Sequence, residues 1–272
     1  MKKILCPVDF SESSMNGVEY ASHLTRDLGA GLTLLYVRTS IWPEAMQLEQ
    51  EVNESNDALQ SKLTVAVAEI QREFGVPCHY HVEQTTDTLE GAISALAFNY
   101  DLVVMGTNGA DTFYQYAFGS NSYQVIEKSK CPVILVPVTC AYRSLNTLIY
   151  AYDPDTNPIF LVEQLKRLTA PLKASVTVLH ISEEKVSDEV RRKMEILEGA
   201  IQARGSKLSP WTFDFTHSDE VGWALNRYMK THNGDMLVLS FHHRSLLEKL
   251  FTENVVKQIS MVASYPVFIF WH

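Results

Sequence analysis

The sequence predicts an α/β protein built from two tandem copies of one parallel-sheet domain. Segments with strand character alternate with segments of helical periodicity along the first half of the chain. Several of the strands are almost wholly apolar, such as DLVVMG (101–106) and CPVILV (131–136), which is typical of a parallel sheet covered by helices on both faces. Similar segments recur in the second half. The expected architecture is therefore a pair of five-stranded, Rossmann-like sandwiches with helices on both faces.

The first copy supplies its elements in a regular order. Ser11 is a good N-cap for the first helix, Gly75 and Pro77 end the second, and Asp87 is the expected cap of the third. The expected elements are strand 2–9, helix 11–29, strand 32–38, helix 43–74, strand 78–85, helix 87–100, strand 101–106, helix 120–129 and strand 132–137.

An internal repeat divides the chain. ILCPVDFS returns as LIYAYDPD 144 positions later, which aligns Asp9 with Asp153, and Val37 aligns with Ile181 at the same shift. DLVVMG and CPVILV return as DMLVLS and YPVFIF at a shift of 134, so the second copy has a shorter middle segment. A fixed shift of this kind is the mark of a repeated structural unit. We expect one domain over residues 1–139 and a second over 140–272.

Glycines follow the apolar strand 101–106 in a pattern suited to phosphate. Gly106, Gly109 and Gly119 are followed at once by Ser120, where a helix is expected to begin. Glycines allow close approach of backbone N–H groups to an anion, and a helix N-terminus offers further donors. Between residues 102 and 126 the only charged residue is Asp111, so a divalent cation such as Mg²⁺ would compensate part of the phosphate charge. The alternative is that the glycines only shape a strand-to-helix loop.

These residues resemble the nucleotide-binding branch of the universal stress protein family. The resemblance rests on Gly-x2-Gly-x9-Gly-Ser, on the opening KKILCPVDFSESS, on TLLYV and on CPVILVP, and it covers most of residues 1–138. It implies a fold like that of the adenine nucleotide alpha hydrolases, and ATP or a related adenine nucleotide as ligand. Asp9 and Val37 would line the nucleoside end. The ribose and phosphates would be held by Gly106, Gly109, Gly119 and Ser120. Met105 and Asn121 complete the expected set of nucleotide-binding residues.

Two features of the loop and of the start of the following helix bear on the ligand. Asn121 is polar where the family often has an aliphatic residue, although a backbone N–H contact would survive the change. The aromatic residues Phe113, Tyr114 and Tyr116 lie inside the loop. They would either close over the ligand or fill its site.

The second copy has lost the glycine pattern. At the shift of 134, Gly106, Gly109, Gly119 and Ser120 fall on Ser240, His243, Glu253 and Asn254. Side chains at these positions restrict backbone approach, and a carboxylate repels an anion. Only the first copy is therefore expected to bind ATP.

The last strand of each copy is short and apolar, as edge strands that need cover are. Because last strands commonly pair across a dimer in this family, we expect residues 133–138 to pair with residues 267–271 in an intramolecular pseudo-dimer. The resemblance also allows a homodimer of two such chains.

Composition limits the other function classes. Residues 1–139 hold 8 Lys and Arg against 17 Asp and Glu, and residues 140–272 hold 15 of each, so a nucleic-acid partner is not expected. No apolar run reaches 18 residues, and the first one stops at Asp9, which predicts neither a membrane span nor a signal peptide. The four cysteines show no C-x-x-C spacing, which favours a reducing cytoplasm.

No catalytic residue is predicted, because the sequence has no nucleophile motif such as G-x-S-x-G. His79, His81 and Glu83 alternate along one strand face, but a solvated face is favoured over a metal site there. We expect a non-enzymatic stress protein that binds ATP. The alternatives are a ligand-free universal stress protein that binds partners and, less favoured, an enzyme of nucleotide metabolism.

Overall fold

The computed structural model describes residues 1–39, 56–107, 119–129, 131–183, 185–204, 210–241 and 265–271. Its strands are β1 (Lys3–Pro7), β2 (Gly31–Thr39), β3 (Cys78–Thr85), β4 (Leu102–Thr107), β5 (Val133–Pro137), β6 (Thr147–Ala151), β7 (Ser175–Ser182), β8 (Trp211–His217), β9 (Met236–Phe241) and β10 (Val267–Trp271). Its helices are α1 (Glu12–Leu28), α2 (Asn56–Phe74), α3 (Leu89–Ala97), α4 (Gly119–Lys128), α5 (Pro158–Leu172), α6 (Asp188–Ala203) and α7 (Val221–Thr231).

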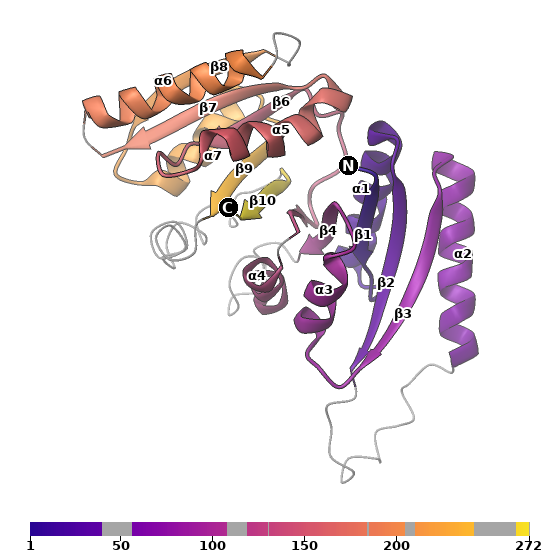
Figure 1. The fold of residues 1–272 in the computed structure, drawn as a ribbon. Coiled ribbons are helices and arrows are strands. Elements are labelled where there is room, and N and C mark those ends of the chain that lie inside the picture. The colour runs from indigo at the N-terminus through magenta and orange to yellow at the C-terminus, as the bar shows by residue number, and fades with distance from the viewer. Residues whose placement is uncertain are drawn as a thin grey trace.

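The ten strands of the described residues belong to one sheet, in the order β3-β2-β1-β4-β5-β10-β9-β6-β7-β8 (Figure 1). Neighbouring strands are parallel except at the centre, where β5 and β10 run antiparallel. There Phe268 lies opposite Ile134, and Val267 opposite Leu135. The α/β fold class is confirmed, and the last strands of the two halves pair as expected.

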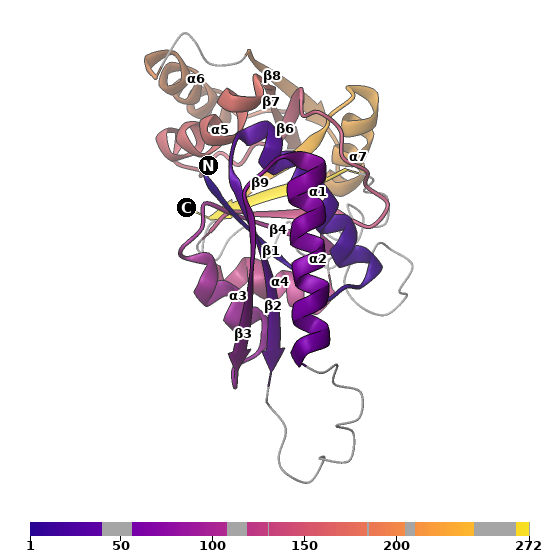
Figure 2. The ribbon, with the colours of Figure 1, turned by 90° about the vertical axis from the view of Figure 1, so that its right-hand side faces the viewer.

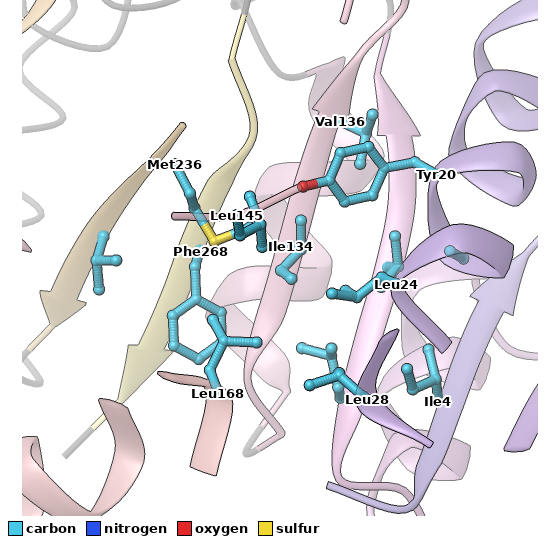
Figure 3. Packing of buried hydrophobic residues seen from close by; sticks show 14 of the residues in the cluster. Ile4, Tyr20, Leu24, Leu28, Ile134, Val136, Leu145, Leu168, Met236 and Phe268 are labelled. Atoms are coloured by element: carbon cyan, nitrogen blue, oxygen red, sulfur yellow. The ribbon is translucent and has the colours of Figure 1, made fainter. Parts of the chain in front are cut away.

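Helices cover both faces of the sheet, so the sheet separates two apolar cores. On one face α1, α2, α5 and α6 pack in a core that runs across both halves of the chain; α2 lies in front of α1 in Figure 2. Leu24 of α1, Ile134 of β5, Leu168 of α5 and Phe268 of β10 contribute to it (Figure 3). The other face is covered by α3, α4 and α7. Because one core contains side chains from both halves, the halves support each other.

Hydrogen bonds at equivalent positions of the two halves have equivalent partners. The positions are related by the shifts of 144 and 134 found in the sequence. The pairs are Lys2 N to Asp101 Oδ2 and Asn146 N to Asp235 Oδ2, both 2.8 Å, then Val8 N to Leu35 O (2.9 Å) and Tyr152 N to Leu179 O (2.8 Å).

The segment between β5 and β6 is fixed on α1 by Tyr142. The Tyr142 ring stacks on His23 at 4.7 Å between centroids and meets the edge of Tyr20 at 5.0 Å. The Phe74 ring of α2 meets the His23 ring edge to face, with 4.8 Å between their centroids. The Tyr142 hydroxyl donates to Asp27 Oδ2 at 2.6 Å. The residues that connect the two halves therefore pack against the first helix.

The start of α3 differs from the expected one, and the expected start of α2 lies outside the described residues. Thr88, and not Asp87, is the N-cap of α3: its backbone is extended and its Oγ1 accepts from Gly91 N at 3.2 Å. Asp87 instead accepts from Thr88 N through Oδ1 at 2.7 Å. The prediction of an Asp87 cap was wrong because both residues are good caps and only the backbone geometry decides between them. The helix expected from residue 43 is described from Asn56 onwards, and 43–55 lie outside the described residues.

Candidate functional site

The candidate site lies at the carboxyl ends of β1 and β4, which are neighbours in the sheet. From β1 the strand order runs one way to β2 and β3, and from β4 it runs the other way to β5. The helix after β1, α1, lies on one face of the sheet, and the helix after β4, α4, lies on the other. Ligands of open α/β sheets bind in the crevice at such a point. Asp9 directly after β1, Val37 in β2 and Gly106 in β4 all belong to this edge of the sheet.

Asp9 organises the turn between β1 and α1. Its Oδ1 accepts from Ser11 N at 2.9 Å and from Ser11 Oγ at 2.6 Å, while Asp9 N donates to Ser14 Oγ at 3.3 Å. Burial acts to raise the pKa of Asp9, but the hydrogen bonds from Ser11 and Ser14 outweigh it and lower the pKa below its usual value. Asp9 is therefore an exposed anion at neutral pH, suited to accept hydrogen bonds from a ligand and unsuited to lie beside phosphate.

Phe10 holds this turn in an unusual conformation that the sequence did not predict. Its φ of 64° lies in the left-handed region, which is uncommon for a residue with a side chain. The Phe10 ring lies 6.2 Å from that of Tyr36, and Lys62 Nζ lies 5.7 Å from its centroid. These contacts hold the ring on the α2 side of the sheet and leave the Asp9 carboxylate exposed.

Val37 and Met105 form the apolar part of the predicted set. Val37 is half-buried and packs against the core on the α3 side, and Met105 belongs to the same core with 7% of its surface exposed. Val37 thus retains surface for a ligand, whereas Met105 is almost covered by protein.

Gly106 has a packing role that the sequence analysis missed. A Cβ atom on Gly106 would lie 1.7 Å from the carbonyl oxygen of Ser13 in α1. Gly17 faces it from the helix, and a Cβ there would lie 2.4 Å from Gly106 N. Two glycines, one on each element, therefore let α1 lie directly on β4. This contact brings the first turn of α1, with Ser13 and Ser14, to the end of β4.

Helix α4 begins at Gly119, one residue before the expected start, and includes Ser120 and Asn121. Its N-terminus carries the backbone donors that the phosphate hypothesis requires. Its C-terminal part is anchored, because Val125 and Ile126 are fully buried and Lys128 Nζ lies 3.2 Å from Glu90 Oε1 of α3. Gly109 lies outside the described residues, as do the aromatic residues of the loop.

The equivalent place in the second half is filled by hydroxyl groups. Ser240, which aligns with Gly106, bonds through Oγ to the Tyr150 hydroxyl at 2.7 Å and to Thr156 Oγ1 at 2.8 Å. Tyr150 also donates to Thr156 Oγ1 at 3.1 Å. All three side chains are buried, so they form a closed polar cluster between β6, β9 and the residues before α5. His243, Glu253 and Asn254 lie outside the described residues.

The two aligned aspartates also differ in exposure. Asp153 Oδ1 accepts from Asp155 N at 3.0 Å, as Asp9 accepts from Ser11 N. The two side chains differ in exposure. Asp153 has only 7% of its surface exposed, whereas Asp9 is exposed. The turn is thus the same in both halves, but only the first half presents its carboxylate to solvent.

The alternating residues of β3 make a local pair. His81 Nε2 lies 2.9 Å from Glu83 Oε2 on the strand surface. Across the described ranges, no group of three or more His, Cys, Asp or Glu side chains is arranged to hold a metal ion.

Comparison with known proteins identifies the family. The sequence model described as "Universal stress protein family" matches residues 1–137. The chain belongs to the universal stress protein family. A universal stress protein of Synechocystis sp. is 20% identical over 292 aligned positions, which cover 99% of this chain and all of that protein.

A solved structure shares the fold. The fold matches a universal stress protein from Archaeoglobus fulgidus with a TM-score of 0.77, at 18% identity and over 99% of this chain and 98% of that one. A universal stress protein solved in complex with cAMP matches 50% of this chain and 96% of its own at 19% identity, with a TM-score of 0.36. Within the described part of the chain, no helix has the length and apolar character needed to cross a membrane.

Proposed function

We propose that this universal stress protein binds ATP, or a related adenine nucleotide, at one site in its first half. The observation that carries the proposal is the contrast between the two halves at aligned positions. At Gly106 the space of a side chain is taken by the backbone of Ser13, so the first turn of α1 lies against the end of β4, whereas its counterpart Ser240 bonds there to Tyr150 and Thr156. Among the described residues, the first half therefore presents backbone at the end of β4, beside the N-termini of α1 and α4, where the second half has a buried cluster of hydroxyl groups.

The negative charge of Asp9 and the positive end of the α4 dipole suit different parts of a nucleotide. The exposed Asp9 carboxylate suits hydrogen-bond donors of a ribose or base, with Val37 as an apolar neighbour. Phosphates suit the N-terminus of α4, where backbone donors and the helix dipole favour negative charge. Because no Lys or Arg lies between residues 102 and 126, Mg²⁺ would supply the remaining positive charge.

In this proposal the second half does not bind nucleotide and serves as the structural partner of the first half. We treat residues 1–139 and 140–272 as two universal stress protein domains that form an intramolecular pseudo-dimer through β5 and β10. The repeated hydrogen bonds and the shared core support this division. The protein would act in the cytoplasm as a nucleotide-dependent stress regulator, without enzymatic turnover, and two chains would be able to form a homodimer.

The second candidate is a ligand-free universal stress protein that binds a protein partner. It is favoured by the packing role of Gly106, which explains that glycine without any ligand. The same contact does not explain Gly119, so the two candidates differ in what they expect of that residue.

Calorimetric titration with ATP and Mg²⁺ tests the proposal. Wild-type protein should bind close to one ATP per chain. Gly119→Glu should abolish binding, because it places a carboxylate at the start of α4; Glu253 is the residue that aligns with Gly119 in the sequence of the second half. Gly199→Glu is the matched control: Gly199 is exposed on α6 of the second half, and an added Cβ meets nothing within 4 Å. Absence of binding by the wild type would favour the ligand-free candidate.

A further inference from the structure

The C-terminal end of α4 receives a hydrogen bond from the other half of the chain. The last four carbonyl groups of an α-helix have no partner within the helix. In α4, Val125 O accepts from Ser129 N at 2.8 Å. Ile126 O accepts from the indole Nε1 of Trp271, the last residue of β10 and 145 positions away in the sequence. One end of a first-half helix is thus capped by a second-half side chain.

The residue that aligns with Trp271 in the first half cannot donate such a bond. At the shift of 134, Trp271 aligns with Pro137, which has no N–H group. Pro137 instead accepts through its carbonyl from Asn16 Nδ2 at 2.9 Å. Among the described residues, the second half thus donates to a first-half helix from a position at which the first half has a proline.

The hydrogen bond from Trp271 holds the C-terminal end of α4, and the N-terminal end of the same helix is the candidate phosphate site. A helix of 10 residues is about 15 Å long, so a shift at one end moves the other. Side-chain contacts fix α4 at its C-terminal part through Ile126, Lys128 and Trp271. Phosphate binding by backbone N–H groups depends on where these donors point.

We propose that Trp271 is a positioning residue through which the second half sets α4 for phosphate binding. The inference rests on the proposed function and deepens it, since it gives the second half a role in nucleotide affinity. It also predicts which part of the ligand is affected. Phosphates lie at α4 and the nucleoside lies at Asp9 and Val37, so Trp271 should influence ATP and leave adenosine unaffected.

The test compares Trp271→Phe with Trp211→Phe. Both substitutions remove an indole N–H and keep an aromatic ring. Trp211 is the control because its Nε1 is buried with no hydrogen-bond partner among the described residues. Binding of ATP and of adenosine is measured by calorimetry below the melting temperature, together with hydrogen exchange of the segment 119–129. Trp271→Tyr serves as a second variant if the Phe variant does not stay folded.

Trp271→Phe should weaken ATP binding by about two-fold to ten-fold, the factor for one hydrogen bond. It should leave adenosine binding unchanged and speed exchange in 119–129, while Trp211→Phe does neither. An equal loss of both ligands would show general destabilisation and overturn the inference, as would unchanged ATP binding. If the wild type binds no ATP, the proposed function fails. Faster exchange in the variant would then still support the cap on α4, and unchanged exchange would overturn it.

Discussion

Replacing Gly106 by alanine tests how closely α1 packs on β4. The added Cβ would lie 1.7 Å from Ser13 O, 2.5 Å from Ser13 C and 3.1 Å from Ser14 N, whereas real Cβ contacts essentially never fall below 3.0 Å. The neighbours are backbone atoms, so no side chain can rotate away. The first turn of α1 has to move by more than about 1 Å, and overpacking of this kind costs about 1–3 kcal/mol.

Thermal unfolding measures this cost. For a chain of this size, 1 kcal/mol corresponds to about 2–4 °C in melting temperature, so a cost of about 1–3 kcal/mol should lower the melting temperature of Gly106→Ala by roughly 2–12 °C. Gly199→Ala is the control. Its Cβ meets nothing within 4 Å in the middle of α6, and alanine is about 1 kcal/mol better than glycine in a helix, so this variant should melt slightly higher. Unchanged melting of Gly106→Ala would refute the argument that α1 rests directly on β4.

Three further predictions concern the rest of the fold. Burial acts to raise the pKa of Asp101, but two backbone N–H donors lower it overall; its stabilisation is therefore complete above the usual value of 3.8 and lost as pH falls below it. The difference in urea stability between wild type and Asp101→Asn should shrink below pH 3.8, and a difference that grows there would contradict this. Tyr142→Phe removes the 2.6 Å bond to Asp27 and should cost about 1–2 kcal/mol, visible as a lower urea midpoint; an unchanged midpoint would count against a role for this bond. Ile134→Lys puts a charge opposite Phe268 in the central strand pair and should split calorimetric unfolding into two transitions, whereas one cooperative transition at the wild-type temperature would contradict coupling of the halves.

The sequence predicted the strands, turns and helix caps whose formation depends on residues close together in the chain. Apolar runs marked the buried strands, and the repeat aligned Asp9 with Asp153, whose turns are closed by the same backbone bond. Ser11 was recognised as the cap of α1, and its side chain accepts from Ser14 N. Each of these depends on residues within a few positions of one another, so the chain itself carries the signal.

The contacts that shape the site were not predictable in this way. Gly17 has no special backbone angle and is explained only by Gly106, 89 positions later, once α1 lies on β4. The hydroxyl cluster of Tyr150, Thr156 and Ser240 likewise joins three separate segments. The sequence indicated that the second half had lost its glycines, but not what fills the space, because that depends on tertiary packing.

Native mass spectrometry of the whole chain with ATP and Mg²⁺ tests the central claim most directly. The account predicts that the folded protein takes up one ATP per chain and no second one as the concentration rises. Two bound nucleotides would contradict the closed state of the second half, and none would contradict the nucleotide site itself.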